Sequence, residues 1–244
     1  MNHLQQLTQK YNQIWRVLAC LLIASLSIPS MTMAQSSESL PKEQVAHHPA
    51  FPREVILVDA GHGGIDGGTS FQDILEKNIN LAIAKKLFVL LRKQGYYAVL
   101  NRTGDYALSD ENQWLRSSSR HLRDLAQRKE LSQQIPTLIV VSLHVNWGRN
   151  PSKGGALVLH QNEGRSVLLA SAIQDHLNPL YPTRGTIKLG NPFYLLNQVA
   201  DPAVIVETGF ISNAHDRQLL CDQRGQLAIA ESIAAGINYF LTAI

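Results

Sequence analysis

The sequence predicts an α/β domain, built on a mainly parallel (mixed), twisted sheet of about six strands with helices on both faces. Two observations support this prediction. From residue 53 onward, short apolar runs of strand length alternate with longer segments in which apolar residues recur at helical spacing. In addition, 45% of the residues are hydrophobic, and a segment of about 190 residues is long enough to bury a well-filled core.

The first predicted strand, Val55 to Asp59, is an apolar run that leads into a glycine-rich loop. A helix follows, because apolar residues recur on one face of the next segment. Asp73 is expected to cap this helix, with Glu76 three residues on as its capping-box partner, and Gly95 is expected to end it. Tyr96 to Leu100 is the second predicted strand.

The remaining elements follow the same alternation. His121 to Gln133 is predicted to be a charged helix, and Thr137 to Leu143, just after Pro136, is the most strongly apolar strand. The later elements are a strand over Ala156 to His160, a helix over Ser166 to Leu177, strands over Phe193 to Leu196 and Ala203 to Glu207, and a closing helix over Leu227 to Leu241.

Residues 1–34 are typical of a secretory signal peptide. They contain Lys10 and Arg16 and no acidic residue, then an uncharged run from Val17 to Ile28 and a small-residue ending. The twelve residues of this run are too few to span a bilayer comfortably, although retention as an N-terminal anchor stays open. Residues 35–52 are expected to form a flexible linker before a single domain over 53–244. We therefore expect export across the cytoplasmic membrane.

Charge and cysteine content limit the functions and the sources of stability that this chain can have. Loss of Lys10 and Arg16 with the signal peptide would leave 20 of the 22 basic residues against 19 acidic ones, so the formal charge falls from +3 to +1. This balance gives no basis for nucleic-acid binding. Cys221 would be the only cysteine in the mature chain, which excludes an internal disulfide as a source of stability.

The loop after the first strand, within VILVDAGHGGIDGGT, carries one histidine, His62, among glycines. The loop does not fit a phosphate-binding motif. Thr69 stands where a Walker motif requires lysine, and Asp66 stands where a dinucleotide-binding motif requires glycine. The role of His62 must therefore be decided by partners elsewhere in the chain.

Polar side chains follow three of the predicted strands. Asp59 and His62 come at the end of the first strand, His144 and Asn146 after the strand that begins at residue 137, and Glu207 at the end of the last strand. In an open parallel sheet, ligands bind beyond the carboxyl ends of the strands. We therefore expect these side chains to form a site at one edge of the sheet.

Two imidazoles and one carboxylate are a ligand set suited to Zn²⁺, and His62, His144 and Glu76 can supply it. Glu207 is then a second carboxylate that can take a proton from water and pass it to a leaving amine. Three of the four also have structural interpretations. Glu76 fits a helix cap, His144 a hydrogen-bonded core histidine and His62 a turn residue. Glu207 is harder to explain in that way, because a carboxylate beside buried apolar residues is costly without a partner.

Four segments in this order, VDAGHGGIDGG, LEKNINLAIAKKL, VVSLHVN and PAVIVETGFISN, resemble the signature blocks of the zinc-dependent N-acetylmuramoyl-L-alanine amidases, which cut bacterial peptidoglycan. The resemblance extends from about Val55 to the end of the chain. It implies that His62, Glu76 and His144 bind one Zn²⁺ per chain and that Glu207 is the catalytic glutamate. The implied reaction is hydrolysis of the amide between N-acetylmuramic acid and the L-alanine of the stem peptide.

Supporting roles are expected for other polar residues. Asn146, Asp59 and Asp66 are placed to orient ligands or substrate, although Asp66 among glycines also fits a turn residue. Arg184 or Lys188 is expected to contact a stem-peptide carboxylate, with surface solvation as the structural alternative.

The resemblance also implies a peptidoglycan substrate and a place in the periplasm or the cell wall. The segment from His144 to Phe193 already holds a predicted strand and helix, which leaves little room for the helix that blocks the zinc site in many division-associated members. The chain is thus similar to the compact members of the family, some of which act in sporulation. We expect a monomer; a protein activator, the stem-peptide preference and the physiological role stay open.

Three alternatives remain open. The same metal and base would serve a zinc carboxypeptidase or other peptidase acting on wall peptides. A glycosidase with Glu76 and Glu207 as its acid pair is also possible on composition, but it would leave the two histidines unexplained. The third alternative is a non-catalytic wall-binding or activator module that has kept the fold.

Overall fold

The computed structural model describes residues 53–110, 112 and 114–243, which belong to one compact unit. The predicted signal peptide and linker, residues 1–52, lie outside the described residues. Within the described part of the chain, no helix combines the length and the apolar character needed to cross a membrane.

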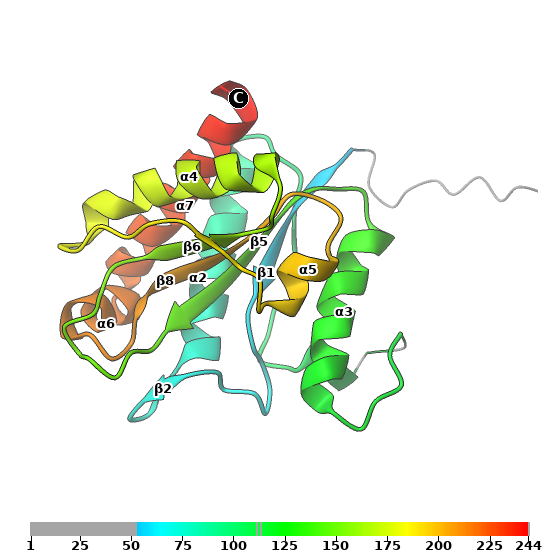
Figure 1. Ribbon diagram of the computed structural model, residues 1–244, viewed down its shortest axis with the longest axis horizontal. Helices are drawn as coiled ribbons and strands as arrows, with labels where there is room; N and C mark the ends of the chain where they lie inside the picture. Colours follow the sequence, from blue (N-terminus) through cyan, green and yellow to red (C-terminus); the bar gives the residue numbers. More distant parts are fainter. Residues whose placement is uncertain (1–52, 111, 113, 244) are drawn as a thin grey trace, which may run out of the picture. The chain divides into compact units, whose positions relative to one another are not determined.

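A six-stranded sheet forms the centre of this unit, in the order β4-β1-β5-β8-β6-β7 (Figure 1). The strands are β1 (Val55–Ala60), β4 (Ala98–Leu100), β5 (Thr137–Asn146), β6 (Leu157–His160), β7 (Lys188–Leu189) and β8 (Ala203–Phe210). The first four strands in this order run parallel, whereas β6 pairs antiparallel with β8 and parallel with β7. The predicted mixed, mainly parallel sheet is therefore confirmed.

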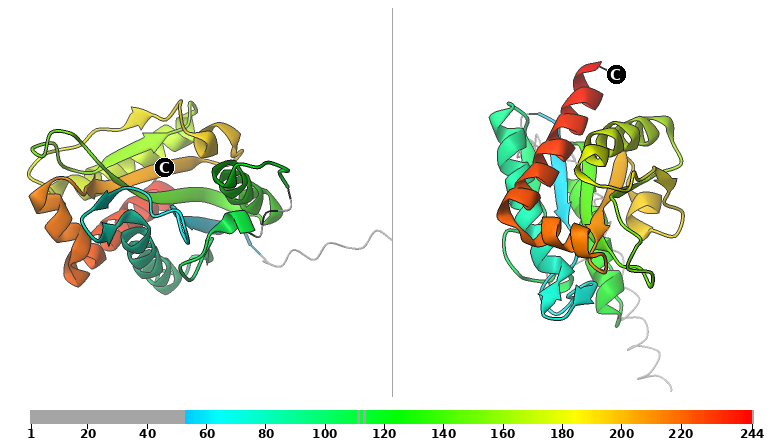
Figure 2. Two further views of the ribbon diagram at one scale, coloured as in Figure 1. Left: turned by 90° about the horizontal axis from the view of Figure 1, so that it is seen from below. Right: turned by 90° about the vertical axis from the view of Figure 1, so that its left-hand side faces the viewer.

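Helices cover both faces of the sheet, as predicted (Figure 2). On one face lie α2 (Glu76–Lys93), α4 (Gly164–Leu177), α6 (Ala214–Cys221) and α7 (Gln223–Ala243), and on the other lie α3 (Arg120–Gln134) and the short α5 (Tyr194–Gln198). The side chains of successive strand residues point to opposite faces of the sheet. Val141 packs in the larger core under α2, α4 and α7, and its neighbour Val140 packs in the smaller core with Leu195 of α5. Because both faces are buried, the strands appear in the sequence as continuous apolar runs.

Two sequence predictions of local structure are wrong. Phe193 to Leu196, predicted as a strand, instead forms the N-cap and first turn of α5, and the strand at this edge of the sheet, next to β6, is β7. A short apolar run does not by itself distinguish a strand from a turn of buried helix. Asp73 does not cap a helix, because it lies in the turn of a small hairpin made of β2 (Ser70–Phe71) and β3 (Ile74–Leu75).

The other predicted elements are present, with shifted ends. The helices predicted over 121–133, 166–177 and 227–241 correspond to α3, α4 and α7. Strands β5 and β8 continue past their predicted ends because the ladder between them extends, with one irregularity, to the pair Asn146 and Phe210. Helix α6 and the 3₁₀ turns η1 (Leu108–Asp110) and η2 (Asn178–Leu180) had no counterpart in the prediction.

Candidate metal centre

The carboxyl ends of β1, β5 and β8 meet at one edge of the sheet, as predicted. Ala60, the last residue of β1, pairs with Leu143 of β5, and one step further along β5 His144 pairs with Glu207 of β8. Three parallel strands in register thus bring the glycine loop, His144 and Glu207 to the same place. The strands that place these groups, β1, β5 and β8, consist largely of buried residues.

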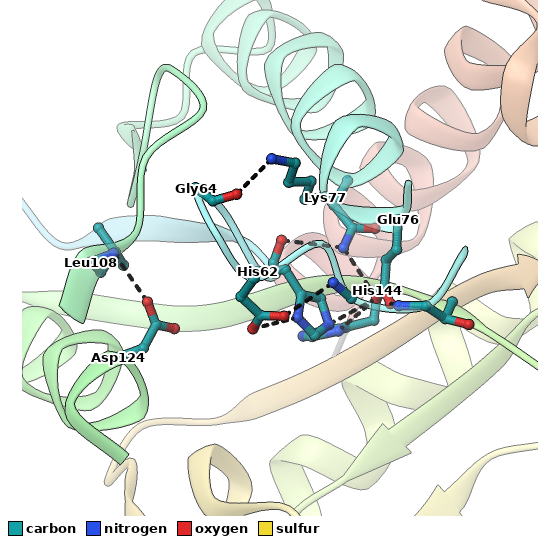
Figure 3. Close-up of polar contacts among 12 residues, drawn as sticks. His62, Gly64, Glu76, Lys77, Leu108, Asp124 and His144 are labelled. Atoms are coloured by element: carbon teal, nitrogen blue, oxygen red, sulfur yellow. Dashed lines mark hydrogen bonds and ion pairs between the residues drawn. The ribbon is translucent and has the colours of Figure 1, made fainter. Parts of the chain in front are cut away.

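His62, Glu76 and His144 point toward one another at this edge (Figure 3). Oε1 of Glu76 lies 3.2 Å from Nε2 of His62 and 3.0 Å from Nδ1 of His144. Ligands of a tetrahedral zinc ion, with bonds of about 2.0–2.1 Å, lie about 3.3 Å apart. One donor atom from each residue falls within 4.8 Å of the other two. The donor set and its spacing therefore fit a tetrahedral metal ion with one position left for water or substrate.

The Glu76 carboxylate is buried, with only 3% of the residue exposed, and is held at both oxygens. Oε1 accepts hydrogen bonds from the backbone N–H of Val145 (2.9 Å) and from the Asn80 side chain (3.2 Å), and Oε2 accepts one from the N–H of Thr69 (2.7 Å). Burial opposes ionisation, but His144 and His62 outweigh it and hold the pKa of Glu76 far below its usual range. Glu76 is thus an ionised candidate ligand directed into the site, and its carboxylate does not cap its own helix.

His62 is oriented by Asp66. Its Nδ1 donates to Asp66 Oδ2 at 2.8 Å, while Asp66 Oδ1 accepts a hydrogen bond from the N–H of Gly68 at 3.1 Å. Burial disfavours the charged imidazole, but the hydrogen bonds to Asp66 and Glu76 raise the pKa of His62 to about 9. The bond to His62 in turn lowers the pKa of Asp66 to about 2. Since Nδ1 is committed to Asp66, Nε2 is the nitrogen that faces the centre.

The glycines pack around the ligands. A side chain at Gly61 would meet the ring of His144 at 2.4 Å. At Gly68, which has φ +67°, it would meet Glu76 Oε2 at 2.5 Å and His62 Cδ2 at 2.7 Å. Gly67 differs, because a side chain there would meet only Leu75, at an ordinary 3.5 Å. The small residues at 61 and 68 are therefore required by the close approach of the loop to the candidate ligands.

Glu207 is the fourth polar group at this edge. Its Oε2 is buried and has no hydrogen-bond partner among the described residues. Burial raises the pKa of Glu207, since a desolvated carboxylate favours the neutral form. A carboxylate with a buried, unpartnered oxygen beside the candidate ligands is suited to exchange protons with a reacting group.

These groups line a cavity of about 490 Å³. Asp59 and Asn146 also line it, but neither contacts a candidate ligand. Asp59 is bonded instead to Asn101 (2.5 Å), to Arg128 (2.6 Å) and to the Ser142 hydroxyl. Asn146 Oδ1 accepts the N–H of Trp147 at 2.8 Å. Both residues therefore support the walls of the site.

Two other predicted contacts lie elsewhere. Arg184 and Lys188 are exposed and are not part of the cavity lining. Among the described residues between 148 and 191, none lines the cavity.

Helix α3 forms one wall of the cavity, a role that the sequence did not reveal. His121, Asp124, Leu125 and Arg128 lie on one face of the helix, at i, i+3, i+4 and i+7, and all line the cavity. Three of them are polar, so this face was indistinguishable from a solvated surface. The exposed aromatic side chains of Trp147 and Phe193 also line the cavity. In the sequence, only the position of Trp147 after a strand and of Phe193 before α5 could have indicated that they line a site.

Comparisons with known proteins agree with this geometry. Residues 56–239 match the family model for N-acetylmuramoyl-L-alanine amidases. The chain is 31% identical to the germination-specific N-acetylmuramoyl-L-alanine amidase of Bacillus subtilis over 191 residues. The aligned region covers 78% of this chain and 80% of that relative.

Two solved structures share the fold. The CwlD amidase from Clostridioides difficile, in complex with the GerS lipoprotein, has a TM-score of 0.71 and 31% identity over 79% of this chain and all of the other. The catalytic domain of CwlV from Bacillus (Paenibacillus) polymyxa var. colistinus has a TM-score of 0.65 and 29% identity over 78% and 98% of the two chains. Since the family model spans well over half of the sequence, the chain belongs to the N-acetylmuramoyl-L-alanine amidase family.

Proposed function

We propose that this peptidoglycan amidase works with one Zn²⁺ held by His62, Glu76 and His144, and with Glu207 as its catalytic base. The reaction is hydrolysis of the amide between N-acetylmuramic acid and the L-alanine of the stem peptide, the activity of the family. One observation carries the proposal. One ring nitrogen of each histidine, Nε2 of His62 and Nδ1 of His144, lies within 3.2 Å of the same carboxylate oxygen of the buried Glu76.

Zinc is favoured by the donor set. Two imidazole nitrogens and one carboxylate oxygen suit a borderline cation, whereas Mg²⁺ and Ca²⁺ prefer oxygen ligands in larger numbers. Three protein ligands and one open position are typical of catalytic zinc sites. Zn²⁺ bound here would supply a Lewis acid that polarises the scissile carbonyl and lowers the pKa of water.

The protein side chains divide the remaining tasks. Asp66 bonds His62 at Nδ1, so that Nε2 is the nitrogen available to the metal. Glu207 takes a proton from the attacking water, and the water oxygen adds to the carbonyl carbon. Glu207 then gives that proton to the nitrogen of alanine as the C–N bond breaks. No covalent intermediate with the protein is required.

Action outside the cytoplasmic membrane follows from the substrate, because peptidoglycan lies there. We propose that residues 1–34 direct export and that the chain acts in the periplasm or the cell wall. A protein partner is also part of the proposal, because the similar CwlD amidase was solved in complex with the GerS lipoprotein.

Product analysis on purified peptidoglycan tests the reaction, with zinc-loaded and metal-stripped protein in parallel. New N-terminal L-alanine with intact muramic acid, formed only by the zinc-loaded protein, is the expected result. Release of terminal D-alanine would identify a carboxypeptidase, and new reducing ends would identify a glycosidase. Equal activity of the metal-stripped protein would overturn the assignment of the zinc site.

A further inference from the structure

Arg128 of α3 lines the cavity and is buried, with only 5% of the residue exposed. Its guanidinium makes two kinds of contact. It forms ion pairs with Asp59 at 2.6 Å and with Asp124 at 2.6 Å. It also donates to two backbone carbonyls at the end of β1, to Ala60 at 3.0 Å and to His62 at 2.9 Å.

The carbonyl of His62 belongs to an unusual backbone. His62 has φ +60°, a left-handed conformation that a residue with a side chain seldom adopts without support. Arg102 holds the two preceding carbonyls, those of Ala60 and Gly61, each at 3.0 Å. The donor that the structure places on the His62 carbonyl is Arg128. Arg128 therefore clamps the residue whose imidazole faces Glu76.

Arginine is suited to this clamp for a geometric reason. Its planar fork holds several N–H donors in fixed directions, so that Nε bonds Asp124, Nη1 bonds Asp59 and Ala60, and Nη2 is left for His62. A lysine has a single nitrogen and cannot span these acceptors. The two carboxylates also fix the guanidinium, because they stabilise its charge in a buried place.

We propose that Arg128 is a positioning residue for the metal centre, which holds the left-handed His62 backbone so that the His62 imidazole is aimed at the ion. This inference rests on the proposed function, since it requires His62 to be a metal ligand. Arg128 acts through the His62 carbonyl and needs no contact with the substrate.

The test compares Arg128→Gln with the unaltered protein and with Arg123→Gln as a matched control. Arg123 lies on the same helix and makes a hydrogen bond to the Ser117 carbonyl at 2.6 Å, outside the cavity lining. Zinc affinity is measured by competition with a chromophoric chelator. Loss of support around a metal ligand typically weakens affinity by about 10- to 100-fold, and we expect this for Arg128→Gln alone.

Thermal unfolding of the metal-free proteins separates positioning from general stability. A purely structural role would lower the unfolding temperature of Arg128→Gln and leave zinc affinity, measured well below that temperature, unchanged. That result would overturn the inference. If Arg128→Gln does not fold, Arg128→Lys decides, because it keeps a charge opposite Asp59 but loses the fork. Arg128→Lys should also bind zinc more weakly, and unaltered affinity in this variant would refute the proposal.

Failure of the proposed function would appear differently. The unaltered protein would then show no zinc binding in the same competition assay, before any variant is compared. Zinc binding by the unaltered protein together with equal binding by Arg128→Gln would instead reject only the role of Arg128.

Discussion

His144 and Glu207 are paired residues in the parallel ladder between β5 and β8. Neighbouring strands lie about 4.8 Å apart, so a candidate ligand and the candidate base are held side by side by the backbone of the core. Glu207 has a buried oxygen with no hydrogen-bond partner among the described residues, whereas both candidate histidine ligands contact Glu76. The roles of ligand and base can therefore be separated by mutation.

Glu207→Gln should abolish most turnover and leave zinc binding intact. The amide keeps the shape of the carboxylate but cannot accept the proton, and loss of a general base typically lowers the rate by about 10²- to 10⁴-fold. Amide hydrolysis and zinc affinity are measured on the same preparation. Glu231→Gln, on the exposed side of α7, is the control and should retain full activity. Full activity of Glu207→Gln would show that another group is the base.

Metal removal should abolish activity and lower thermal stability. Zinc that binds only the folded protein stabilises it by about 2.7 kcal/mol when its free concentration is 100 times the dissociation constant. We therefore expect the unfolding temperature to fall on chelation and to recover with Zn²⁺ and not with Mg²⁺. Glu76→Gln should remove this zinc-dependent shift. An unfolding temperature that is indifferent to chelation in the unaltered protein would contradict a zinc site.

Gly68→Ala and Gly67→Ala should differ sharply although the two residues are adjacent. Alanine at 68 would be strained at φ +67° and would collide with the side chains of Glu76 and His62, whereas alanine at 67 meets only Leu75 at contact distance. We expect Gly68→Ala to weaken zinc binding at least about tenfold, as other disturbances around metal ligands do, and Gly67→Ala to leave it unchanged. Equal affinities would refute the packing role of Gly68.

The buried carboxylate of Asp59 predicts a specific dependence of stability on pH. Burial opposes its ionisation, but Arg128 and then Ser142 outweigh burial and lower the pKa of Asp59. Because the folded pKa lies below the unfolded value of about 4, the stabilisation is complete above pH 4 and is lost as the pH falls through the folded value.

Asp59→Asn should consequently reduce the free energy of unfolding by about 3 kcal/mol at pH 7, because it leaves Arg128 without this buried partner. The difference from the unaltered protein should narrow below pH 4. Denaturant unfolding of the metal-free proteins across pH measures it. A difference that stays constant from pH 7 to pH 3 would show that the charge of Asp59 does not stabilise the fold.

The sequence predicted the sheet and the position of the site well, for a physical reason. Strands buried on both faces must be apolar throughout, so Val55 to Asp59 and Thr137 to Leu143 were recognisable without any tertiary information. The polar residues just after them necessarily lie at the carboxyl edge. Local structure was harder to predict where one residue type fits two conformations. Asp73 fits a helix cap as well as it fits the hairpin turn in which it lies.

The sequence by itself determined the fold class and, through the resemblance of its four motif blocks, the family. It also singled out the four residues of the proposed zinc site and base, because each of them follows a recognisable strand or opens a helix. Only the tertiary structure decided what holds them. His62 donates to Asp66, Gly61 and Gly68 approach the candidate ligands closely, and Arg128 donates to the His62 carbonyl. No periodic pattern in the sequence predicts these contacts. Arg128 lies 66 residues from His62 in the chain, and only the tertiary fold brings the two together.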